Sequence, residues 1–372
     1  MFDKARALER KGEKLIHFEL GEPDFETPQH IREAAKRALD QGFTHYTPNA
    51  GLLELREAIA EKLKKDNEIE VDPASEICVT VGSQEAAYLV ITCTIEPGDE
   101  VLITDPAYYT YANCVRMAQG TPVWVPLRKE NDFRLAPEEL EKQITSKSKM
   151  IVINSPSNPT GTMCGKEDLR EIDEIARKHE LLVLSDEIYE KLVYDGNRHY
   201  SIAALSNNPD QIMTLNGFSK AYAMTGWRLG YVVASKQIIS ELVKVQQTAV
   251  SCPTAFAQKG AVEALRGPQD SLTKMKEEFE RRRNIIIDGL NGISGLSVTR
   301  PKGAFYAFVD MRSTGKPSLE LAELLLNEAK IVTTPGSAFG AHGEGYLRIS
   351  YATSIENINT GIEGIRRVLQ KM

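Results

Sequence analysis

The sequence predicts an α/β fold, with a large domain built on a mostly parallel seven-stranded sheet and a smaller α+β domain. Short runs rich in β-branched residues recur along the chain, and several are apolar throughout, as strands covered on both faces are. Amphipathic helical patterns separate most of these runs, and such alternation is typical of parallel sheets. The alternation ends near residue 266, which indicates a second domain.

Seven runs supply the strands that we expect in the large sheet. They lie at residues 76–81, 100–105, 121–126, 150–155, 181–186, 211–216 and 229–234. After the fourth run, the segment "GKEDLREIDEIARKHE" (165–180) spaces its apolar residues as an amphipathic helix does. A crossover helix at this place would connect two parallel strands.

The C-terminal part has a different order of elements. Its expected elements are a charged helix over 271–290, a hairpin over 295–311, a helix over 318–330, a strand over 345–352 and a final helix. This order is typical of an α+β unit. We therefore expect a large domain at residues 41–265, and a small domain formed by residues 1–40 together with 266–372.

The composition indicates a globular protein that acts on small molecules. The chain has 372 residues, of which 42% are hydrophobic and 26% charged. Its formal charge of −7 argues against nucleic acid and anionic membranes as partners, and no apolar run is long enough to cross a bilayer. The five cysteines form no CxxC pair and the six histidines lack ligand spacing, so we expect a reducing, cytoplasmic setting and no bound metal.

Polar side chains follow five of the expected strands, at the edge where open α/β sheets bind their ligands. They are Ser83 and Gln84 at a helix start, Tyr108, Asn158 in a Pro-rich turn, Asp186 with Tyr189, and Lys220. Lys220 stands in "NGFSKAYAMTGWRLG" among residues that solvate an amine poorly, and Arg228 follows eight positions later. We expect these groups to converge on one cleft.

This combination of groups suits pyridoxal 5′-phosphate. A helix N-terminus at Ser83 binds phosphate through free N–H groups, and Arg228 adds a charged contact. Tyr108 can stack on a flat ring, Asp186 can keep a ring nitrogen protonated, and desolvated Lys220 can attack an aldehyde. Each residue alone has a plainer interpretation, such as a helix cap for Asp186 or a core residue for Tyr108.

A set of motifs then points to a family. After "GEPDF" (21–25) come "YTPNAGLLELREAI", "VGSQEA", "DPAYYTY", "NSPSNPTG", "SDEIYE", "NGFSKAYAMTGWRLGY", "PKGAFYAF" and "LRIS". With these motifs in this order, the chain resembles the class I aminotransferases of the pyridoxal-phosphate fold type I superfamily, in the aspartate and broad-range branch. The resemblance covers residues 21–352, and "SKxxxMTGWRxG" is its most specific motif.

The resemblance implies roles for individual residues. For catalysis and the cofactor, it makes Lys220 the Schiff-base lysine, Asp186 the partner of the pyridine nitrogen, Tyr189 and Asn158 donors to the 3′-oxygen, Tyr108 the stacking aromatic, and Ser83, Gln84, Ser219 and Arg228 contacts near the phosphate. For the substrate, it implies that Arg348 clamps the α-carboxylate, with Gly21 and Asn158 nearby. Tyr46 would reach the phosphate of the neighbouring subunit, which implies a homodimer with shared active sites.

Three features depart from the family pattern. Many relatives carry serine three positions before the lysine, where this chain has Gly217, and Ser219 stands next to the lysine instead. Tyr109 replaces a frequent proline, which would move Tyr108 slightly. The chain also begins close to "GEPDF", so the N-terminal segment that covers the site in relatives is expected to be shorter or truncated.

The implied activity is a ping-pong transfer of an amino group from an L-amino acid, aspartate or a broader set, to a 2-oxo acid such as 2-oxoglutarate. Lys220, once freed, would move the α-proton. A carbon–sulfur β-lyase or an aminocyclopropane-carboxylate synthase of the same fold is the alternative. A DNA-binding regulator is disfavoured, because no helix-turn-helix fits before Gly21. No second arginine can be placed for a distal carboxylate, so the donor side chain stays open.

Overall fold

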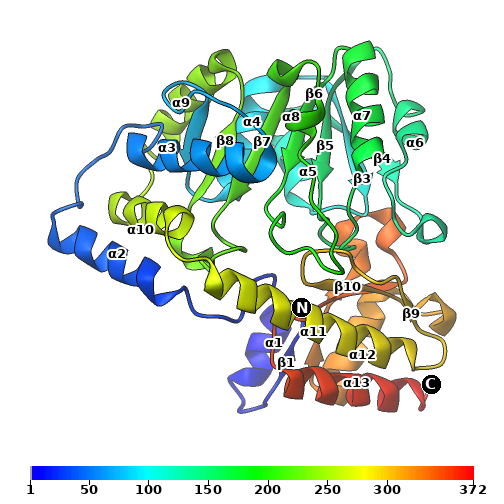
Figure 1. Ribbon diagram of the computed structural model, residues 1–372. Coiled ribbons are helices and arrows are strands. Elements are labelled where there is room, and N and C mark those ends of the chain that lie inside the picture. The colour runs from blue at the N-terminus through cyan, green and yellow to red at the C-terminus, as the bar shows by residue number, and fades with distance from the viewer. Residues whose placement is uncertain (1) are drawn as a thin grey trace.

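The computed structural model describes residues 2–372, and its larger part is built on a seven-stranded sheet (Figure 1). The strands, in spatial order, are β2 (Ile77–Thr80), β8 (Gly230–Val233), β7 (Ile212–Gly217), β6 (Leu182–Asp186), β5 (Ser148–Asn154), β3 (Glu100–Asp105) and β4 (Thr121–Pro126). Strand β8 runs antiparallel to both neighbours, and the other adjacent pairs are parallel. The seven predicted strands and the mostly parallel sheet are confirmed.

Helices cover both faces of this sheet. They are α3 (Leu53–Lys62), α4 (Ser83–Thr94), α5 (Thr110–Met117), α6 (Pro137–Glu141), α7 (Lys166–Lys178), α8 (Ile202–Leu205), α9 (Lys236–Ala249) and α10 (Ala255–Arg266). In β5, Met150 and Val152 pack in the cluster with α4, α5 and α9, whereas Ile151 and Ile153 pack in the cluster with α6 and α7. Because both faces are covered, the four buried positions of the strand, 150–153, are all apolar.

The smaller part contains a four-stranded sheet in the order β12-β13-β10-β9. Its elements are α11 (Asp270–Asn291), β9 (Ser297–Val298), β10 (Tyr306–Asp310), α12 (Ser318–Ala329), β11 (Ile331–Val332), β12 (Thr334–Pro335), β13 (Tyr346–Ser350) and α13 (Ile355–Leu369). Strands β9 and β10 pair antiparallel, with Val298 opposite Val309, so the predicted hairpin is present. The predicted helices and the later strand are also present, within a few residues of their expected bounds.

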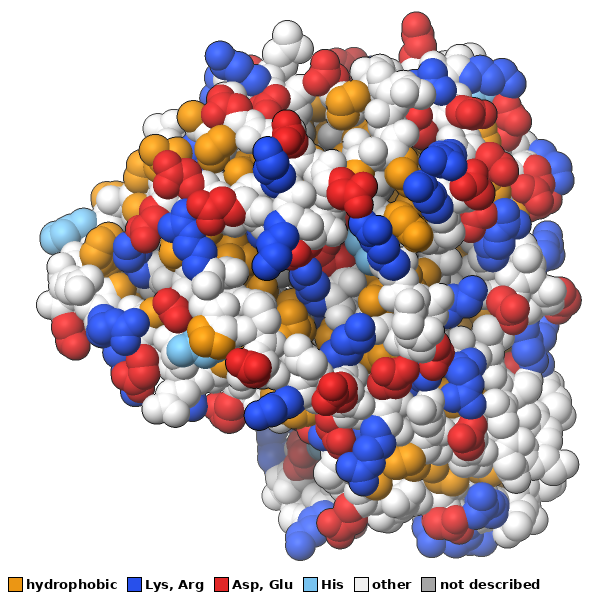
Figure 2. Space-filling view, in the orientation of Figure 1, with side chains coloured by type: hydrophobic (Ala, Val, Ile, Leu, Met, Phe, Trp, Pro, Cys, Tyr) orange, Lys and Arg blue, Asp and Glu red, His pale blue; other side chains and the backbone are white. Residues whose placement is uncertain are grey.

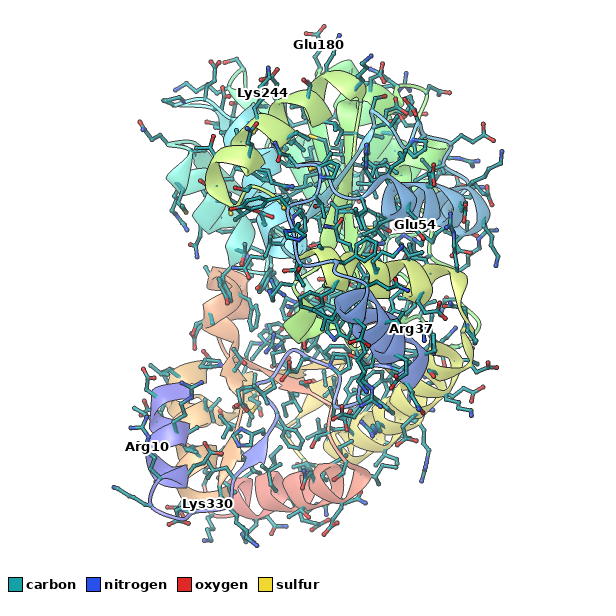
Figure 3. All side chains as sticks on the ribbon, turned by 90° about the vertical axis from the view of Figure 1, so that its left-hand side faces the viewer. Arg10, Arg37, Glu54, Glu180, Lys244 and Lys330 are labelled. Carbon is teal, nitrogen blue, oxygen red and sulfur yellow. The ribbon has the colours of Figure 1, made fainter. Side chains whose placement is uncertain are left out.

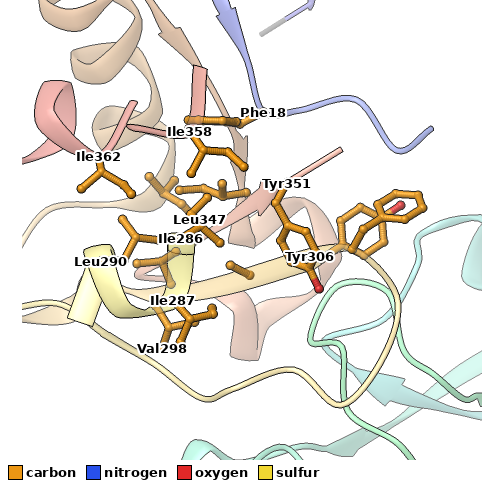
Figure 4. Packing of buried hydrophobic residues seen from close by; sticks show 14 of the residues in the cluster. Phe18, Ile286, Ile287, Leu290, Val298, Tyr306, Leu347, Tyr351, Ile358 and Ile362 are labelled. Atoms are coloured by element: carbon orange, nitrogen blue, oxygen red, sulfur yellow. The ribbon is translucent and has the colours of Figure 1, made fainter. Parts of the chain in front are cut away.

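One apolar cluster holds the smaller part together (Figure 4). Ile286 and Leu290 of α11 and Ile362 of α13 pack with Leu347 of β13. Phe18, from the N-terminal segment, joins the same cluster and is 1% exposed. Burial of such side chains contributes roughly 1.5–3 kcal/mol each relative to exposure. The cluster therefore fixes the N-terminal segment against the C-terminal third of the chain.

The first forty residues contact both parts of the molecule. Helix α1 (Phe2–Glu9) and β1 (Ile16–His17) lie with the smaller part, where β1 pairs with β11. Helix α2 (Gln29–Asp40) packs on α10 instead, with Ile31 buried there, and Figure 3 shows α2 beside the larger part. The domain division at residues 41 and 265 stays a prediction.

The surface carries charges of both signs. Figure 2 shows Lys and Arg side chains interspersed with Asp and Glu over the visible face. Within residues 2–372, no helix combines the length and apolar character that a membrane span requires.

Candidate active site

A cavity of about 340 Å³ opens at the carboxyl ends of the parallel strands, between the two parts of the molecule. It is lined by the predicted residues Gly21, Ser83, Gln84, Tyr108, Asn158, Asp186, Tyr189, Ser219, Lys220, Arg228 and Arg348. Strands β3, β5, β6 and β7 each end at this cavity, because parallel strands present their carboxyl ends at one edge of the sheet. The convergence expected from the strand ends is therefore present.

Tyr46 lies outside this cavity. Its side chain is 89% exposed and lines a separate depression of about 530 Å³ together with Phe43, Cys252 and Phe256. The resemblance assigns Tyr46 to the site of a neighbouring subunit, so its role stays a prediction.

Lys220 presents its amine in a poorly solvated position. Its Nζ donates to the carbonyl oxygen of Gly21 and lies 5.9 Å from the ring centres of both Tyr189 and Phe305. Burial is the main cause that lowers the pKa of Lys220 to about 8, and the charge of Arg348 acts in the same direction. At pH 7 an amine with this pKa is neutral in roughly a tenth of molecules, far more often than an ordinary lysine, and the neutral form is the one that a nucleophile or base requires.

Asp186 ends β6 with a buried carboxylate. Its Oδ2 accepts a hydrogen bond from the Tyr111 hydroxyl at 2.5 Å, and its Oδ1 accepts from the Ile188 backbone at 3.0 Å. Burial raises the pKa of Asp186 to about 6, although both hydrogen bonds favour the charged form. A turn follows β6, so the helix-cap interpretation does not apply. A protonated ring nitrogen beside this carboxylate would satisfy its charge.

The start of α4 forms a cradle for an anion. Ser83 opens the helix, and Arg228 lies so close that a Cβ on Gly82 would overlap its guanidinium group. A Cβ on Gly217 would lie 2.5 Å from Ser83 Oγ, which in turn donates to the Asn216 carbonyl at 3.0 Å. The absent serine at 217 thus has a physical reason, because the Ser83 hydroxyl already occupies that space. Free helix N–H groups, a hydroxyl and a guanidinium suit a phosphate.

The chemistry of these groups fits pyridoxal phosphate. Lys220 supplies a weakly solvated amine, Asp186 a buried carboxylate, and the cradle at Ser83 and Arg228 a place for the phosphate. Tyr108 lines the same cavity, with its ring centre 5.9 Å from that of Tyr111. Each functional part of the cofactor therefore meets a group of matching chemistry.

Arg348 is a buried cation held by neutral acceptors. It lies on β13, is 7% exposed, and donates to Asn158 Oδ1 at 3.1 Å, to Thr334 Oγ1 at 3.2 Å and to the Glu19 carbonyl at 2.5 Å. Within residues 2–372, no carboxylate forms an ion pair with it, and its Nε lacks a hydrogen-bond partner. A buried guanidinium in this state favours an incoming carboxylate.

Several residues of the site were missed by the sequence prediction. They are Glu19, Tyr111, Tyr306, Thr334 and Phe339. The Tyr306 hydroxyl lies 2.8 Å from that of Tyr189, and its ring centre is 4.6 Å from the Arg348 guanidinium carbon. Tyr111 lies in the first turn of α5 and belongs to the motif "DPAYYTY", which contained it without indicating its role.

A buried charged cluster holds the segment after β6. Lys62 Nζ pairs with Glu190, and Asn67 Nδ2 donates to Glu190 at 2.7 Å. Glu187 accepts from Ser201 Oγ at 2.7 Å and contacts His199 Nε2 at 3.0 Å. One ligand atom each from Glu187, Glu190 and His199 lies within 4.8 Å of the others, but the Lys62 ammonium already supplies a cation. We therefore interpret the cluster as support for the Asp186–Tyr189 segment.

Arg348→Ala should weaken the binding of every amino donor, because all donors share the α-carboxylate. The loss should be roughly 2–5 kcal/mol, as for other truncated buried charge contacts. Michaelis constants for several donors would measure it. Arg312→Ala is the control, since Arg312 lies on the surface of the same part and pairs with Asp310 at 2.8 Å. An increase confined to one donor would mean that Arg348 contacts a side chain.

Comparisons with known proteins agree with this geometry. Residues 13–365 match the family described as "Aminotransferase class I and II". The chain is 49% identical to an aspartate aminotransferase of Pyrococcus abyssi and 46% identical to aromatic-amino-acid aminotransferase 2 of Thermococcus litoralis, covering 100% of this chain and 95% of each relative.

Two solved structures are similar along nearly the whole chain. The aromatic aminotransferase of Pyrococcus horikoshii superimposes with a TM-score of 0.95 at 48% identity, covering 99% of both chains. The aspartate aminotransferase of Thermus thermophilus with maleate gives a TM-score of 0.94 at 40% identity, covering 98% of this chain and 94% of that one.

Proposed function

We propose a substrate range and an assembly from the premise that this chain belongs to the class I and II aminotransferase family. It is a fold type I, pyridoxal-phosphate-dependent aminotransferase that moves an amino group from an amino acid to a 2-oxo acid. The proposed donor is an L-amino acid, aspartate or one of a broader set, and the proposed acceptor is 2-oxoglutarate. Relatives with both aspartate and aromatic names support that breadth.

One observation carries the assignment of roles: Lys220, Asp186 and Arg348 line the same cavity from different elements. Bound pyridoxal phosphate supplies an aldehyde that reacts with amines and a protonated ring that withdraws electrons. Arg348 binds the donor α-carboxylate together with Asn158 and thereby orients the Cα–H bond. The backbone carbonyl of Gly21 accepts a hydrogen bond from the free amine of Lys220.

Lys220 Nζ then takes the proton from the donor Cα as a general base and later returns it as an acid. With the cofactor bound, Asp186 would hold the proton on the ring nitrogen through its charge. Tyr189 would donate from its hydroxyl to the 3′-oxygen, and the Tyr306 hydroxyl lies 2.8 Å from that of Tyr189 and keeps it in place. Buried side chains around Asp186 and Tyr189 exclude water, which strengthens these interactions.

The assembly that we propose is a cytoplasmic homodimer with shared sites. Tyr46 supports it, because its side chain is exposed, its hydroxyl forms no hydrogen bond within residues 2–372, and it suits the phosphate of a partner subunit. Cys78, Cys93, Cys114, Cys164 and Cys252 are free thiols, as is usual in a reducing compartment. Light scattering of the purified enzyme would measure the mass, and a monomer that retains full activity would contradict the assembly.

A panel of L-amino acids with 2-oxoglutarate, followed by the 2-oxo acids formed, tests the proposed function. Aspartate and aromatic donors should each give the matching 2-oxo acid and glutamate. Cystathionine serves as the contrasting substrate, because a carbon–sulfur β-lyase would release pyruvate from it without any 2-oxo acid acceptor. Pyruvate release in the absence of amino transfer would overturn the proposal.

A further inference from the structure

Glu19 brings a carboxylate to the substrate side of the cavity. It is 4% exposed and lines the cavity together with Thr334, Phe339 and Arg348. Its backbone carbonyl accepts a hydrogen bond from Arg348, so Glu19 lies next to the proposed α-carboxylate site. In the described part of the chain, Glu19 Oε2 is buried and has no hydrogen-bond partner. Such an oxygen is costly unless a ligand satisfies it.

The His17 ring lies between the carboxylates of Glu19 and Glu9. His17 Nδ1 lies 2.8 Å from Glu19 Oε1, and His17 Nε2 lies 3.0 Å from Glu9 Oε1. Carboxylate oxygens accept hydrogen bonds, so both ring nitrogens must donate, which only the imidazolium does. Burial lowers the pKa of His17, but the bonds and charges of Glu19 and Glu9 outweigh it and leave the pKa raised. Glu19 Oε1 is thus occupied by the His17 ring, and Oε2 has no hydrogen-bond partner among the described residues.

The remaining lining offers no cation to a second carboxylate. Within residues 2–372, the cations that line the cavity are Lys220, Arg228 and Arg348, and each already has a proposed role. The lining is otherwise rich in aromatic rings, namely Tyr108, Tyr109, Tyr111, Tyr189, Tyr306 and Phe339. A donor side chain therefore meets aromatic surface and one negative charge.

We propose that Glu19 determines donor specificity by disfavouring side chains that end in a carboxylate and favouring uncharged ones, above all aromatic side chains. The proposal rests on the proposed function and narrows its donor range. Like charges placed together where water is excluded repel strongly, which is a common means of rejecting a ligand. Aromatic side chains can pack on the rings of the lining, and a phenol or indole can donate to Oε2.

The same charge acts on a dicarboxylic acceptor. The distal carboxylate of 2-oxoglutarate occupies the region of the donor side chain, because donor and acceptor use one cavity in turn. Removal of the Glu19 charge should therefore lower the Michaelis constant for 2-oxoglutarate as well as that for aspartate. Phenylpyruvate, which has no second carboxylate, should be little affected.

The test compares wild type with Glu19→Gln as loaded enzymes. Half-reaction kcat/KM values for L-aspartate and L-phenylalanine measure the discrimination, and Kd values for the unreactive ligands succinate and 3-phenylpropanoate measure it without turnover. In the variant, we expect kcat/KM for aspartate to rise at least about tenfold and the Kd of succinate to fall at least about tenfold. The values for L-phenylalanine and 3-phenylpropanoate should change less than about threefold. Glu26→Gln is the matched control, because Glu26 is 90% exposed on the same segment.

If Glu19→Gln leaves the aspartate-to-phenylalanine ratio of kcat/KM and the succinate-to-3-phenylpropanoate ratio of Kd unchanged, the proposal is overturned and Glu19 is a structural residue. If that variant does not fold, His17→Gln gives the second measurement, because it removes the positive charge facing Glu19 and leaves the carboxylate. The preference of His17→Gln for L-phenylalanine over aspartate, and for 3-phenylpropanoate over succinate, should be larger than that of wild type. A smaller preference would also overturn the proposal. If the wild type transfers no amino group but Glu19→Gln still lowers the Kd of succinate, the selection by charge stands and the proposed function fails.

Discussion

Lys220→Ala should abolish amino transfer while the enzyme still holds pyridoxal phosphate. Within residues 2–372, no other lysine lines the cavity, so the variant loses both the amine that bonds the aldehyde and the base for the α-proton. General acid–base catalysis alone contributes typically 10²–10⁴-fold, and loss of the covalent step adds to this. Turnover should fall by at least about 10⁴-fold. The cradle at Ser83 and Arg228 should retain the phosphate.

Two measurements check this result. The visible absorption band of lysine-bound pyridoxal phosphate should be absent from the purified variant, and equilibrium dialysis should still detect bound cofactor. Lys236→Ala is the control, since Lys236 is exposed at the start of α9 and lies away from the cavity. A Lys220→Ala enzyme that keeps the band and transfers amino groups normally would refute the assignment.

Asp186→Ala should impair the chemical step far more than cofactor binding. Without the carboxylate, the ring nitrogen loses the charge that keeps it protonated, so the ring becomes a poorer acceptor of the electrons left at Cα. Phosphate and stacking contacts remain in the variant. We expect α-proton removal to slow by several orders of magnitude, with each tenfold equal to about 1.4 kcal/mol of barrier.

Single-turnover conversion to the aminated cofactor measures this step, and an α-deuterated donor shows whether proton removal limits the rate. Tyr111→Phe distinguishes the effect of the Asp186 charge from that of its hydrogen bond. It removes the 2.5 Å hydrogen bond to Asp186 and leaves the carboxylate in place. A half-reaction rate within about tenfold of the parent would show that Asp186 only shapes the turn after β6. The ring nitrogen would then need another partner.

The large sheet and the site residues at its strand ends could both be predicted from the pattern of apolar runs in the sequence. Buried parallel strands need long apolar runs, and the residue after each run must lie at one edge, so the sequence pattern by itself brings Asp186, Asn158 and Lys220 together. The two-residue strands β1, β11 and β12 escaped prediction, because two residues show no periodicity.

The other half of the site depends on packing between distant segments. Glu19 and Tyr306 reach the cavity only because the smaller part docks against the sheet edge, and no local pattern encodes that docking. "GEPDF" and "PKGAFYAF" marked the neighbourhood through resemblance, but neither motif indicated that the Tyr306 hydroxyl meets Tyr189 at 2.8 Å. Buried contacts of this kind follow from tertiary structure alone.

The close approach of Gly217 to Ser83 ties these two positions together in the evolution of the cradle. A side chain at 217 would put its Cβ 2.5 Å from Ser83 Oγ and 3.0 Å from the Leu229 carbonyl oxygen. Gly217→Ser alone should therefore weaken cofactor binding, and Ser83→Gly alone should remove a hydroxyl. The double variant should recover the part of the loss that comes from the clash with Ser83 Oγ, as a double-mutant cycle would reveal. A lineage can move the hydroxyl from one position to the other only through a less fit intermediate, so descendants tend to keep the arrangement that they inherit.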